Sequence, residues 1–318
     1  MRESTLNRRL RRWLPMMAAV LAILPGCTPA ESGTRGFQGA RAIADLKKIV
    51  ANGPREPGSA ASGAVRAHIK REVEAAGLTL QELPFVAQTP HGPVNMVNLV
   101  AEVKGTEPGL ILLTNHYDTK VFRDFAFAGA NDGGSTTAWM IEMARALGPT
   151  RQGRTVWLCW FDGEEAFVEW SETDSLYGSR QMIAWLQETG RIAEVGASIN
   201  VDMIGDCDLD IVRDKDAPPW LIDLVWNTAS DNDINGFSMR ELVIEDDHIP
   251  FRNAGIPALN LIDFHYGGGA IEHQQNWHTP RDTIALVCAE SLEAVGNVLL
   301  AALPGLDATL SKGSANRE

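Results

Sequence analysis

The chain has 318 residues, of which 45% are hydrophobic, and a formal net charge of −13 at pH 7. This length and composition suffice to bury a sizeable core, and we expect one large domain rather than two small ones. An acidic surface disfavours nucleic acid and anionic lipid as partners, because both are negatively charged themselves. Nothing in the composition indicates an obligate protein partner, so we expect a monomer.

The first 26 residues predict an export signal rather than part of the fold. Four arginines between positions 8 and 12 precede an apolar stretch at positions 13–24, which is too short for a comfortable membrane span. The stretch ends in Leu-Pro-Gly before Cys27, which resembles a bacterial lipobox, where the cysteine becomes the lipidated first residue. The alternative is an ordinary signal peptide that is cut elsewhere. We favour an exported lipoprotein that faces the periplasm or the cell exterior and contacts the membrane only through Cys27.

Beyond the signal, composition divides the chain into three parts. Residues 27–39 are mostly small and polar with several glycines, which predicts a tether. We expect a folded domain over residues 40–305 and a flexible tail over residues 306–318.

Apolar periodicity and turn residues predict alternating helices and strands within the folded domain. Strands separated by helices indicate an α/β sheet with helices on both faces, and an early cluster of three strands indicates that the sheet is mixed. The expected fold is therefore a three-layer α/β/α arrangement around a mixed central sheet. The expected helices lie near residues 43–50, 59–76, 136–147, 179–188, 220–229 and 289–302, and the expected strands near 78–86, 95–103, 109–115, 155–161, 197–201 and 258–262.

Three cysteines follow Cys27 and have no spacing that is typical of a metal site. Cys159 lies in an apolar strand and Cys288 in an apolar helical pattern, where a buried small side chain is the simplest interpretation. One disulfide among Cys159, Cys207 and Cys288 is compatible with the sequence, but its pairing is open.

Adjacent carboxylates mark the expected reaction centre. The hydrophobic run that starts at Trp157 stops at a turn that carries Glu164 and Glu165. Two neighbouring carboxylates at the mouth of a buried strand cost desolvation and repulsion unless a cation or a shared proton offsets them. This turn therefore predicts a metal or acid/base chemistry.

Five segments at strand ends or in loops contribute residues of the types that bind metals. Such loops, at the carboxyl ends of strands, are where α/β sheets place their sites. Zinc takes imidazole nitrogen and carboxylate oxygen, and a catalytic zinc leaves a position open for water or substrate. Any one of these residues alone is more simply a satisfied polar group or a helix cap, but together they indicate a zinc site. They are His116 with Asp118, Asp132, Glu164 with Glu165, Asp202, and His278.

The order of these motifs resembles that of the M28 zinc aminopeptidases and their relatives, the animal-type glutaminyl-peptide cyclotransferases. The motifs are His-x-Asp, Asp-Gly-Gly, Glu-Glu, Asp-Met-Ile-Gly, Asp-His with Pro-Phe, and Trp-His-Thr. The resemblance covers roughly residues 40–303 and implies that the folded domain is catalytic. In both branches it implies a mixed central sheet between helix layers, in agreement with the pattern above.

Two features resemble the cyclotransferases rather than the peptidases. Typical peptidases place Gly-Ser within a few residues of the Glu-Glu pair, whereas here Gly178 follows Glu165 by 13 positions and the insert contains Trp170. The second feature is Asp246-Asp247-His-Ile-Pro-Phe, where peptidases usually have Ser or Thr before a single Asp-His. We therefore expect a zinc-dependent enzyme that converts the N-terminal Gln of peptides and proteins to pyroglutamate and releases ammonia. An M28 aminopeptidase is the alternative, and a non-catalytic binding protein is the third reading.

The resemblance also implies the metal ligands. Asp132, Glu165 and His278 would bind one zinc ion. His116 is kept as in two-zinc peptidases, and with Asp202 it would complete the ligands of a second ion. One ion is favoured, and the count stays open.

The same resemblance implies the catalytic and pocket residues. Glu164 would be the acid/base residue, and Asp202 and Asp246 would form a hydrogen-bonded acidic network with it. Trp170 and Trp277 would wall the substrate pocket, with core packing as the alternative for both.

The sequence departs from the animal enzymes at several positions. A half-cystine pair of those enzymes falls on Asn115 and Thr137, so that disulfide is absent. Glu245 stands where they carry an amide, and the loop with His265 and His273 has no obvious match. The preferred second residue of the substrate is therefore undetermined, and both histidines are expected at the surface.

Overall fold

The computed structural model describes residue 1, residues 36–267 and residues 276–315. The expected export signal, Cys27 and His273 lie outside these described residues. Phe37, which the sequence placed in the tether, is buried and stacks on Trp139 with ring centroids 5.8 Å apart. The folded domain therefore begins by residue 37.

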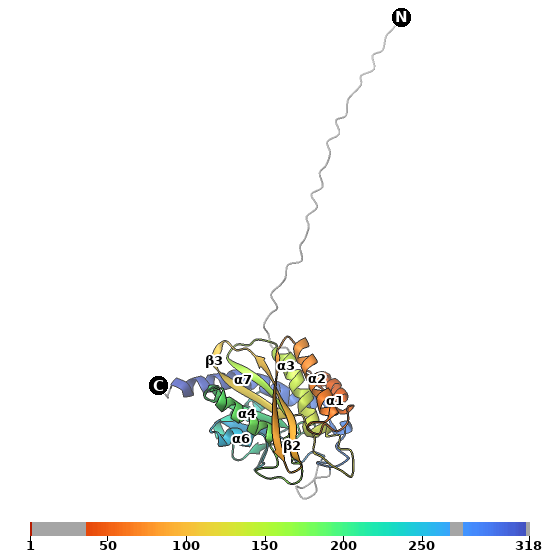
Figure 1. The fold of residues 1–318 in the computed structure, drawn as a ribbon. Helices are drawn as coiled ribbons and strands as arrows, with labels where there is room; N and C mark the ends of the chain where they lie inside the picture. The colour runs from red at the N-terminus through yellow and green to blue at the C-terminus, as the bar shows by residue number, and fades with distance from the viewer. Residues whose placement is uncertain (2–35, 268–275, 316–318) are drawn as a thin grey trace. The chain divides into compact units, whose positions relative to one another are not determined.

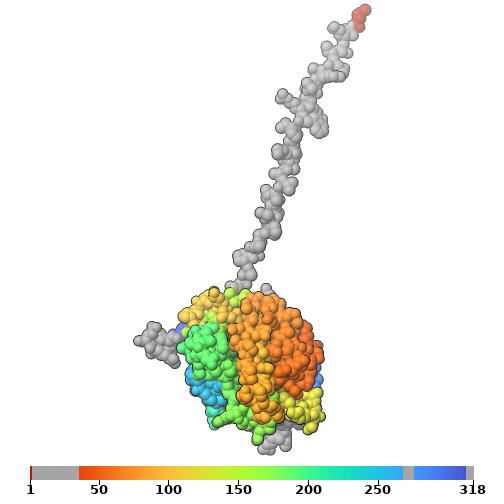
Figure 2. Space-filling view, in the orientation of Figure 1, coloured from red at the N-terminus to blue at the C-terminus, as the bar shows by residue number. Residues whose placement is uncertain are grey.

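A six-stranded mixed sheet occupies the centre of the domain, in the order β1-β2-β4-β3-β5-β8 (Figure 1). β1 and β2 form an antiparallel hairpin, β2 is antiparallel to β4, and β4, β3, β5 and β8 run parallel to one another. Figure 2 shows the hairpin (orange) exposed on one face of the molecule. The strands are β1 Leu80–Thr89, β2 Gly92–Val103, β3 Glu107–His116, β4 Arg154–Phe161, β5 Val195–Asp202 and β8 Ala258–Ile262.

Helices cover both faces of the sheet, which confirms the expected three-layer α/β/α architecture. Successive residues of a strand point to opposite faces. In β3, Ile111 and Leu113 pack in the core beneath one helix layer, whereas Leu110 and Leu112 pack beneath the other. A strand covered on both faces must be apolar throughout, which explains the continuous run in the sequence. The first layer contains α1 Gly39–Val50, α2 Ala60–Ala75, α3 Thr136–Leu147, α5 Pro219–Asp231 and α7 Ala289–Ala315, and the second contains α4 Tyr177–Glu188 and α6 His248–Asn253.

The last helix, α7, is longer than the sequence predicts. It continues through Pro304 to Ala315, so residues 306–315 are helical rather than a flexible tail. Leu306 is buried in the core, and Asp307 forms a 2.6 Å ion pair with Arg151. α7 is long and apolar enough to cross a membrane by composition, but it packs against α1, α3 and α5 as a core helix.

Two short strands and one short helix were not predicted. β6 (Ile211–Asp214) and β7 (Phe237–Leu242) form a separate parallel sheet, and α6 follows them in the chain. The segment between β7 and α6 carries Glu245 and Asp246, so these elements position one wall of the site described below.

The cysteine pairing is resolved by the structure. Cys207 and Cys288 form a disulfide that joins the loop after β5 to the residue before α7. Cys288 is therefore a half-cystine and not simply a buried apolar side chain. Cys159 is a buried free cysteine in β4, as expected.

Candidate active site

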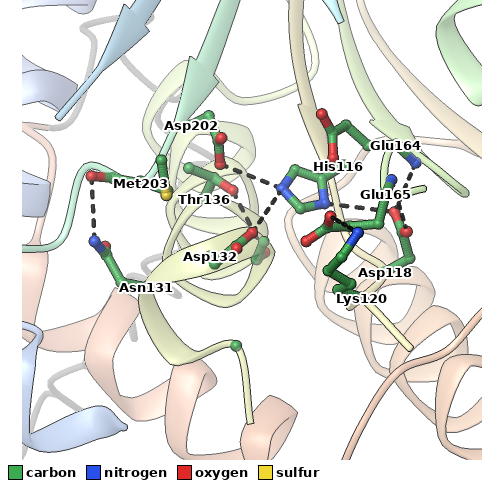
Figure 3. A network of polar contacts seen from close by, with 12 residues as sticks. His116, Asp118, Lys120, Asn131, Asp132, Thr136, Glu164, Glu165, Asp202 and Met203 are labelled. Carbon is green, nitrogen blue, oxygen red and sulfur yellow. Dashed lines mark hydrogen bonds and ion pairs between the residues drawn. The ribbon is translucent and has the colours of Figure 1, made fainter. Parts of the chain in front are cut away.

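Parallel strands bring the expected site residues to one edge of the sheet. His116 is the last residue of β3 and Asp202 the last of β5, while Glu164 and Glu165 follow the end of β4 by a short turn. Because β3 pairs in parallel with both β4 and β5, these ends lie next to each other. Figure 3 shows the side chains converging on one small volume.

Asp132, Glu165 and His278 form one trio that could hold a metal ion. Nε2 of His278 lies 2.9 Å from Oε1 of Glu165 and 3.3 Å from Oδ2 of Asp132. Asp132 comes from the irregular turn Ala130–Ser135 before α3, and His278 from the segment after β8. All three ligand atoms lie within 4.8 Å of one another. Segments far apart in the sequence thus provide one nitrogen and two carboxylates.

A second trio shares Asp132 with the first. Nε2 of His116 lies 3.3 Å from Oδ1 of Asp132 and 3.2 Å from Oδ1 of Asp202. The two oxygens of Asp132 therefore face different imidazoles: Oδ1 faces His116 and Oδ2 faces His278. This arrangement can serve one ion or, with Asp132 as a bridge, two.

The site buries many carboxylates, which suits it to a bound cation or to shared protons. Seven carboxylates, each at most 7% exposed, surround two imidazoles and the ammonium of Lys120. Burial of this much like charge is strongly unfavourable unless cations compensate it. The mixed His, Asp and Glu donors are those that zinc prefers. The seven are Asp118, Asp132, Glu164, Glu165, Asp202, Asp246 and Asp247.

Protonation of the site is tied to metal binding. Burial alone lowers the pKa of His278, but the charges of Glu165 and Asp132 outweigh it and raise the pKa to about 10. Nε2 of His278 therefore carries a proton at neutral pH in the absence of a metal. A metal ion would displace that proton, so binding should release protons.

Glu164 lies beside the first trio and has a strongly perturbed carboxyl group. Burial, reinforced by the charges of Glu165 and Asp246, raises the pKa of Glu164 well above its usual value. A carboxylate with a raised pKa is more basic than an ordinary glutamate, which suits it to acid/base work. Glu164 is not a member of either trio, so it is free for that role.

Asp202 and Asp246 line the same pocket as Glu164, and each also has a polar partner outside this group of three carboxylates. Asp202 pairs with His116, and Oδ2 of Asp246 accepts a 2.8 Å hydrogen bond from Nδ2 of Asn260. The charge of Asp246 contributes to the raised pKa of Glu164.

Asp118 belongs to neither trio and orients the carboxylate pair instead. Its two oxygens accept hydrogen bonds from the backbone N–H groups of Glu164 at 3.1 Å and Glu165 at 3.4 Å. Nδ1 of His116 lies 3.4 Å from Oδ1 of Asp118. Such partners of ligands fix ligand orientation and tune affinity.

Arg55, in the turn between α1 and α2, is a site residue that the sequence analysis missed. Its side chain is fully buried, and its guanidinium donates to four backbone carbonyls, those of Tyr117, Ala128, Gly129 and Asp132, at 2.7–3.2 Å. One guanidinium thus fastens the loop that follows His116 to the turn that carries Asp132. The sequence offered only a weak signal, an arginine between two prolines in a turn.

Two further features fix the backbone at Asp132. The carboxylate of Asp282 accepts hydrogen bonds from the backbone N–H groups of Asn131 at 2.7 Å and Asp132 at 3.1 Å. Gly133 has φ +68°, and a Cβ there would lie 2.7 Å from the carbonyl oxygen of Asp118 and 2.9 Å from the ring of His116. Only glycine fits at position 133, because a side chain there would collide with the Asp118 carbonyl and the His116 ring.

A pocket of about 520 Å³ opens over the ligands, and both expected tryptophans line it. The ring of Trp277 stacks on that of His278 with centroids 4.0 Å apart, so it forms part of the inner wall. Trp170 is 36% exposed, and its Nε1 donates a 2.9 Å hydrogen bond to Glu245. This exposure places Trp170 at the pocket mouth and argues against core packing.

His265, expected at the surface, is buried. It is 7% exposed, and burial lowers its pKa. Phe264, Tyr266 and Trp277 belong to one apolar cluster, and the rings of Phe264 and His265 lie with centroids 5.7 Å apart.

Comparisons with known proteins agree with this geometry. Residues 98–303 match peptidase family M28. The glutaminyl-peptide cyclotransferase of Bos taurus is 31% identical over 278 residues, which cover 75% of this chain and 74% of that protein. A glutaminyl cyclase structure from an Acidobacteriales bacterium is 36% identical, with a TM-score of 0.81, and the match covers 89% of this chain and 99% of that one.

Two further solved structures are similar to this chain, and one of them is named as an aminopeptidase rather than a cyclase. The Porphyromonas gingivalis glutaminyl cyclase is 28% identical with a TM-score of 0.74, over 85% of this chain and 98% of that one. A leucine aminopeptidase precursor from Bacteroides thetaiotaomicron reaches a TM-score of 0.75 at 21% identity, over 86% and 98%, which shows a shared fold only. The chain therefore belongs to peptidase family M28 and, within it, to the glutaminyl-peptide cyclotransferases.

Proposed function

We propose that this protein uses zinc to convert the N-terminal glutaminyl residue of peptides and proteins to a pyroglutamyl residue, with release of ammonia. The observation that carries the proposal is the pocket itself: a His-Asp-Glu trio and a buried acid, Glu164, lie at its base, and the Trp170 insert forms its mouth. By its resemblance to known sequences, the insert is typical of the cyclotransferases, whereas the ligand motifs resemble both branches.

The reaction sets three requirements for the site. The γ-carbonyl must be polarised, the α-amine must lose a proton, and the departing amide nitrogen must gain one. Zinc held by Asp132, Glu165 and His278 would act as the Lewis acid on the carbonyl oxygen. The α-nitrogen then forms a bond to the carboxamide carbon, and the bond from that carbon to the amide nitrogen breaks, which releases ammonia.

Glu164 would carry the proton between the two nitrogens. Its carboxylate takes a proton from the α-amine as the new bond forms and returns it to the leaving nitrogen. Both nitrogens belong to one residue of the substrate, so one carboxylate can reach both in turn. Asp246 supports this role, because its charge raises the pKa of Glu164 and makes the carboxylate more basic.

The apolar part of the pocket would hold the substrate in a folded conformation. Ile262, Phe264 and Trp277 line the pocket beside the trio. Holding the glutaminyl side chain over its own amine makes the reaction effectively unimolecular, which supplies much of the rate. The same walls exclude water, whose attack would give hydrolysis instead of cyclisation.

Mass spectrometry of a peptide mixture tests the reaction. Purified full chain should remove ammonia, 17 Da, from Gln-initiated peptides and leave Leu- and Ala-initiated peptides intact. Glu164→Gln should keep its zinc but lose about 100- to 10,000-fold in turnover, because it removes the proton carrier without removing a ligand. Free leucine or alanine, without loss of ammonia from Gln peptides, would favour the aminopeptidase alternative.

We propose a single zinc ion, bound by the trio that contains His278. Lys120 and Asp118 brace Glu165, whereas His116 already has three carboxylate neighbours that can hold it as an imidazolium. Purified protein should contain about one zinc per chain, and His116→Ala should keep it. Two tightly bound ions, reduced to one in His116→Ala, would contradict the single-ion reading.

We also propose that the protein is exported and anchored through Cys27. The Cys207–Cys288 disulfide supports export, because disulfides persist mainly in oxidising compartments. Palmitate labelling of cells that express wild type or Cys27→Ala tests the anchor. Wild type should be labelled and membrane-bound and the variant unlabelled; equal labelling, or a cytosolic wild type, would contradict it.

A further inference from the structure

The mouth of the pocket is both apolar and acidic. Of the described residues that line the pocket, five are exposed, and we call them the outer rim. They comprise three apolar side chains and two carboxylates, with no cation among them. The outer rim is Val168, Glu169, Trp170, Val243 and Glu245.

The one lysine that lines the pocket does not neutralise the outer rim. The side chain of Lys120 is only 18% exposed, and its Nζ lies 3.8 Å from Oε2 of Glu165 and 3.0 Å from the carbonyl oxygen of Ala166. Its ammonium group therefore compensates the charge of Glu165 at the base of the pocket. The carboxylates of Glu169 and Glu245 remain available to a ligand at the mouth.

The outer rim is held in a defined shape. Nε1 of Trp170 donates to Oε2 of Glu245, which ties the insert to the segment after β7. The carboxylate of Asp174 accepts hydrogen bonds from the backbone N–H groups of Val168 at 2.8 Å and Glu169 at 3.1 Å. An acidic and apolar surface that is fixed before the substrate arrives can discriminate between side chains at small entropic cost.

We infer that the outer rim selects peptides whose second residue is lysine or arginine. The inference rests on the proposed function, because it takes the N-terminal glutamine to occupy the base of the pocket, beside Glu164 and the His278 trio. The next residue must then leave through the mouth and pass Trp170 and Glu245. A side chain with an apolar stem and a cationic head complements both, since the stem and head pack on the indole and the head pairs with the carboxylate.

Three amidated peptides test the inference: Gln-Lys-Ala-amide, Gln-Ala-Ala-amide and Gln-Glu-Ala-amide. Amidation removes the carboxylate at the end of the peptide, so only the second residue differs in charge. With purified full chain at low ionic strength, kcat/KM should be about 2- to 5-fold higher for the lysine peptide than for the alanine peptide, and lower for the glutamate peptide by a similar factor. High salt should compress these ratios, because the outer rim is exposed.

Glu245→Gln is the decisive variant. It removes the charge but keeps a carbonyl oxygen that can accept the Trp170 indole N–H, so the shape of the outer rim is retained. The ratio of kcat/KM for the lysine peptide to kcat/KM for the glutamate peptide should fall by about 2- to 5-fold. Glu172→Gln is the matched control, because Glu172 is exposed in the same insert but does not line the pocket.

The outcomes separate this inference from the proposed function. Cyclisation of all three peptides at equal rates by wild type, or an equal effect of Glu245→Gln and Glu172→Gln, would overturn the selection of cations while leaving cyclisation intact. Failure to cyclise any of the three peptides would instead contradict the proposed function, and the inference with it.

Discussion

The base and the mouth of the pocket are built in opposite ways. The base stands mainly on the ends of parallel strands, is largely buried, and is fastened by Arg55, Asp118 and Asp282 through backbone groups. The mouth consists of loop residues that are exposed and rest on one carboxylate, Asp174, and one hydrogen bond from Trp170. Strand ends thus place the chemistry, whereas exposed loops meet the part of the substrate that varies. Changes at the base should alter metal binding and kcat, and changes at the mouth should alter KM.

The largest effect is expected from Asp132→Ala. It removes the carboxylate that faces both imidazoles, so each trio loses a ligand. Zinc should be lost on dialysis, and kcat/KM should fall by at least about 100-fold, beyond the 10- to 100-fold that is typical of partners one step from a metal. Metal analysis and steady-state kinetics check this. Asp124→Ala, exposed in the preceding loop, is the control and should retain zinc.

Arg55→Met should weaken the metal site without touching a ligand. Four carbonyls lose their common donor, so the turn that carries Asp132 is no longer fastened to the loop after His116. We expect zinc affinity to fall by about 10- to 100-fold. Competition with a chelator, carried out well below the unfolding temperature, measures it.

Stability alone could also depend on Arg55, so a second readout is needed. Arg55→Lys keeps the charge but cannot reach four carbonyls at once, and its zinc affinity should be intermediate. Arg191→Met, a surface change beside Glu194, should leave affinity unchanged. A lower unfolding temperature with unchanged zinc affinity in Arg55→Met would reduce Arg55 to a purely structural residue.

Trp170→Ala should act at the mouth. Loss of the indole removes a wall of the outer rim and the partner of Glu245, so KM should rise by about 5-fold while kcat changes less than about 2-fold. Trp170→Phe keeps a ring but not the N–H donor, so its KM should lie between those of the wild type and Trp170→Ala. A drop in kcat that equals the rise in KM would show that Trp170 also acts at the base, and the contrast between the two regions would fail.

The smallest effect is expected from Asp174→Asn. Burial alone raises the pKa of Asp174, but hydrogen bonds from the backbone of Phe167, from Tyr177 Oη and from the neighbouring N–H groups outweigh it, and the pKa is lowered. The stabilisation is therefore present above the usual aspartate pKa of about 4 and is lost as the pH falls below it.

Two observations check this prediction. Amide exchange at residues 167–169, corrected for the intrinsic rate, should be faster in Asp174→Asn than in wild type at pH 7, and KM should rise by about 2-fold. The difference in exchange between the two proteins should shrink in acid. An insert that exchanges equally in both proteins at pH 7 would mean that Asp174 does not support the mouth.

The candidate ligands could be predicted from the sequence because each stands in a recognisable local motif. Asp132, Glu165 and His278 meet as the resemblance implied. Arg55 could not be found in this way, because the four carbonyls that it binds lie 62 to 77 residues away and a backbone carbonyl has no residue type. Contacts made by backbone groups across the fold leave no pattern in the sequence.

The fold, too, was only partly predictable from the sequence. The central strands were predictable because a doubly covered sheet demands apolar runs. β6 and β7 were not, since they are short and partly polar. The last helix was expected to end near residue 302, but it continues, and the packing of Leu303 and Leu306 outweighs the cost of about 3 kcal/mol for Pro304 inside α7. The disulfide pairing likewise depended on which loops meet, since three cysteines allow three pairings.

Gly133 gives the site an evolutionary constraint of its own. Any side chain there would collide with the backbone at Asp118 and with the ring of His116, and its positive φ already disfavours other residues. A library of variants should therefore show position 133 closed to substitution as firmly as the ligands themselves, although Gly133 binds no metal and touches no substrate. Selection at such a position would preserve the space between ligands, so a search for new activities on this scaffold should vary the mouth and leave this turn alone.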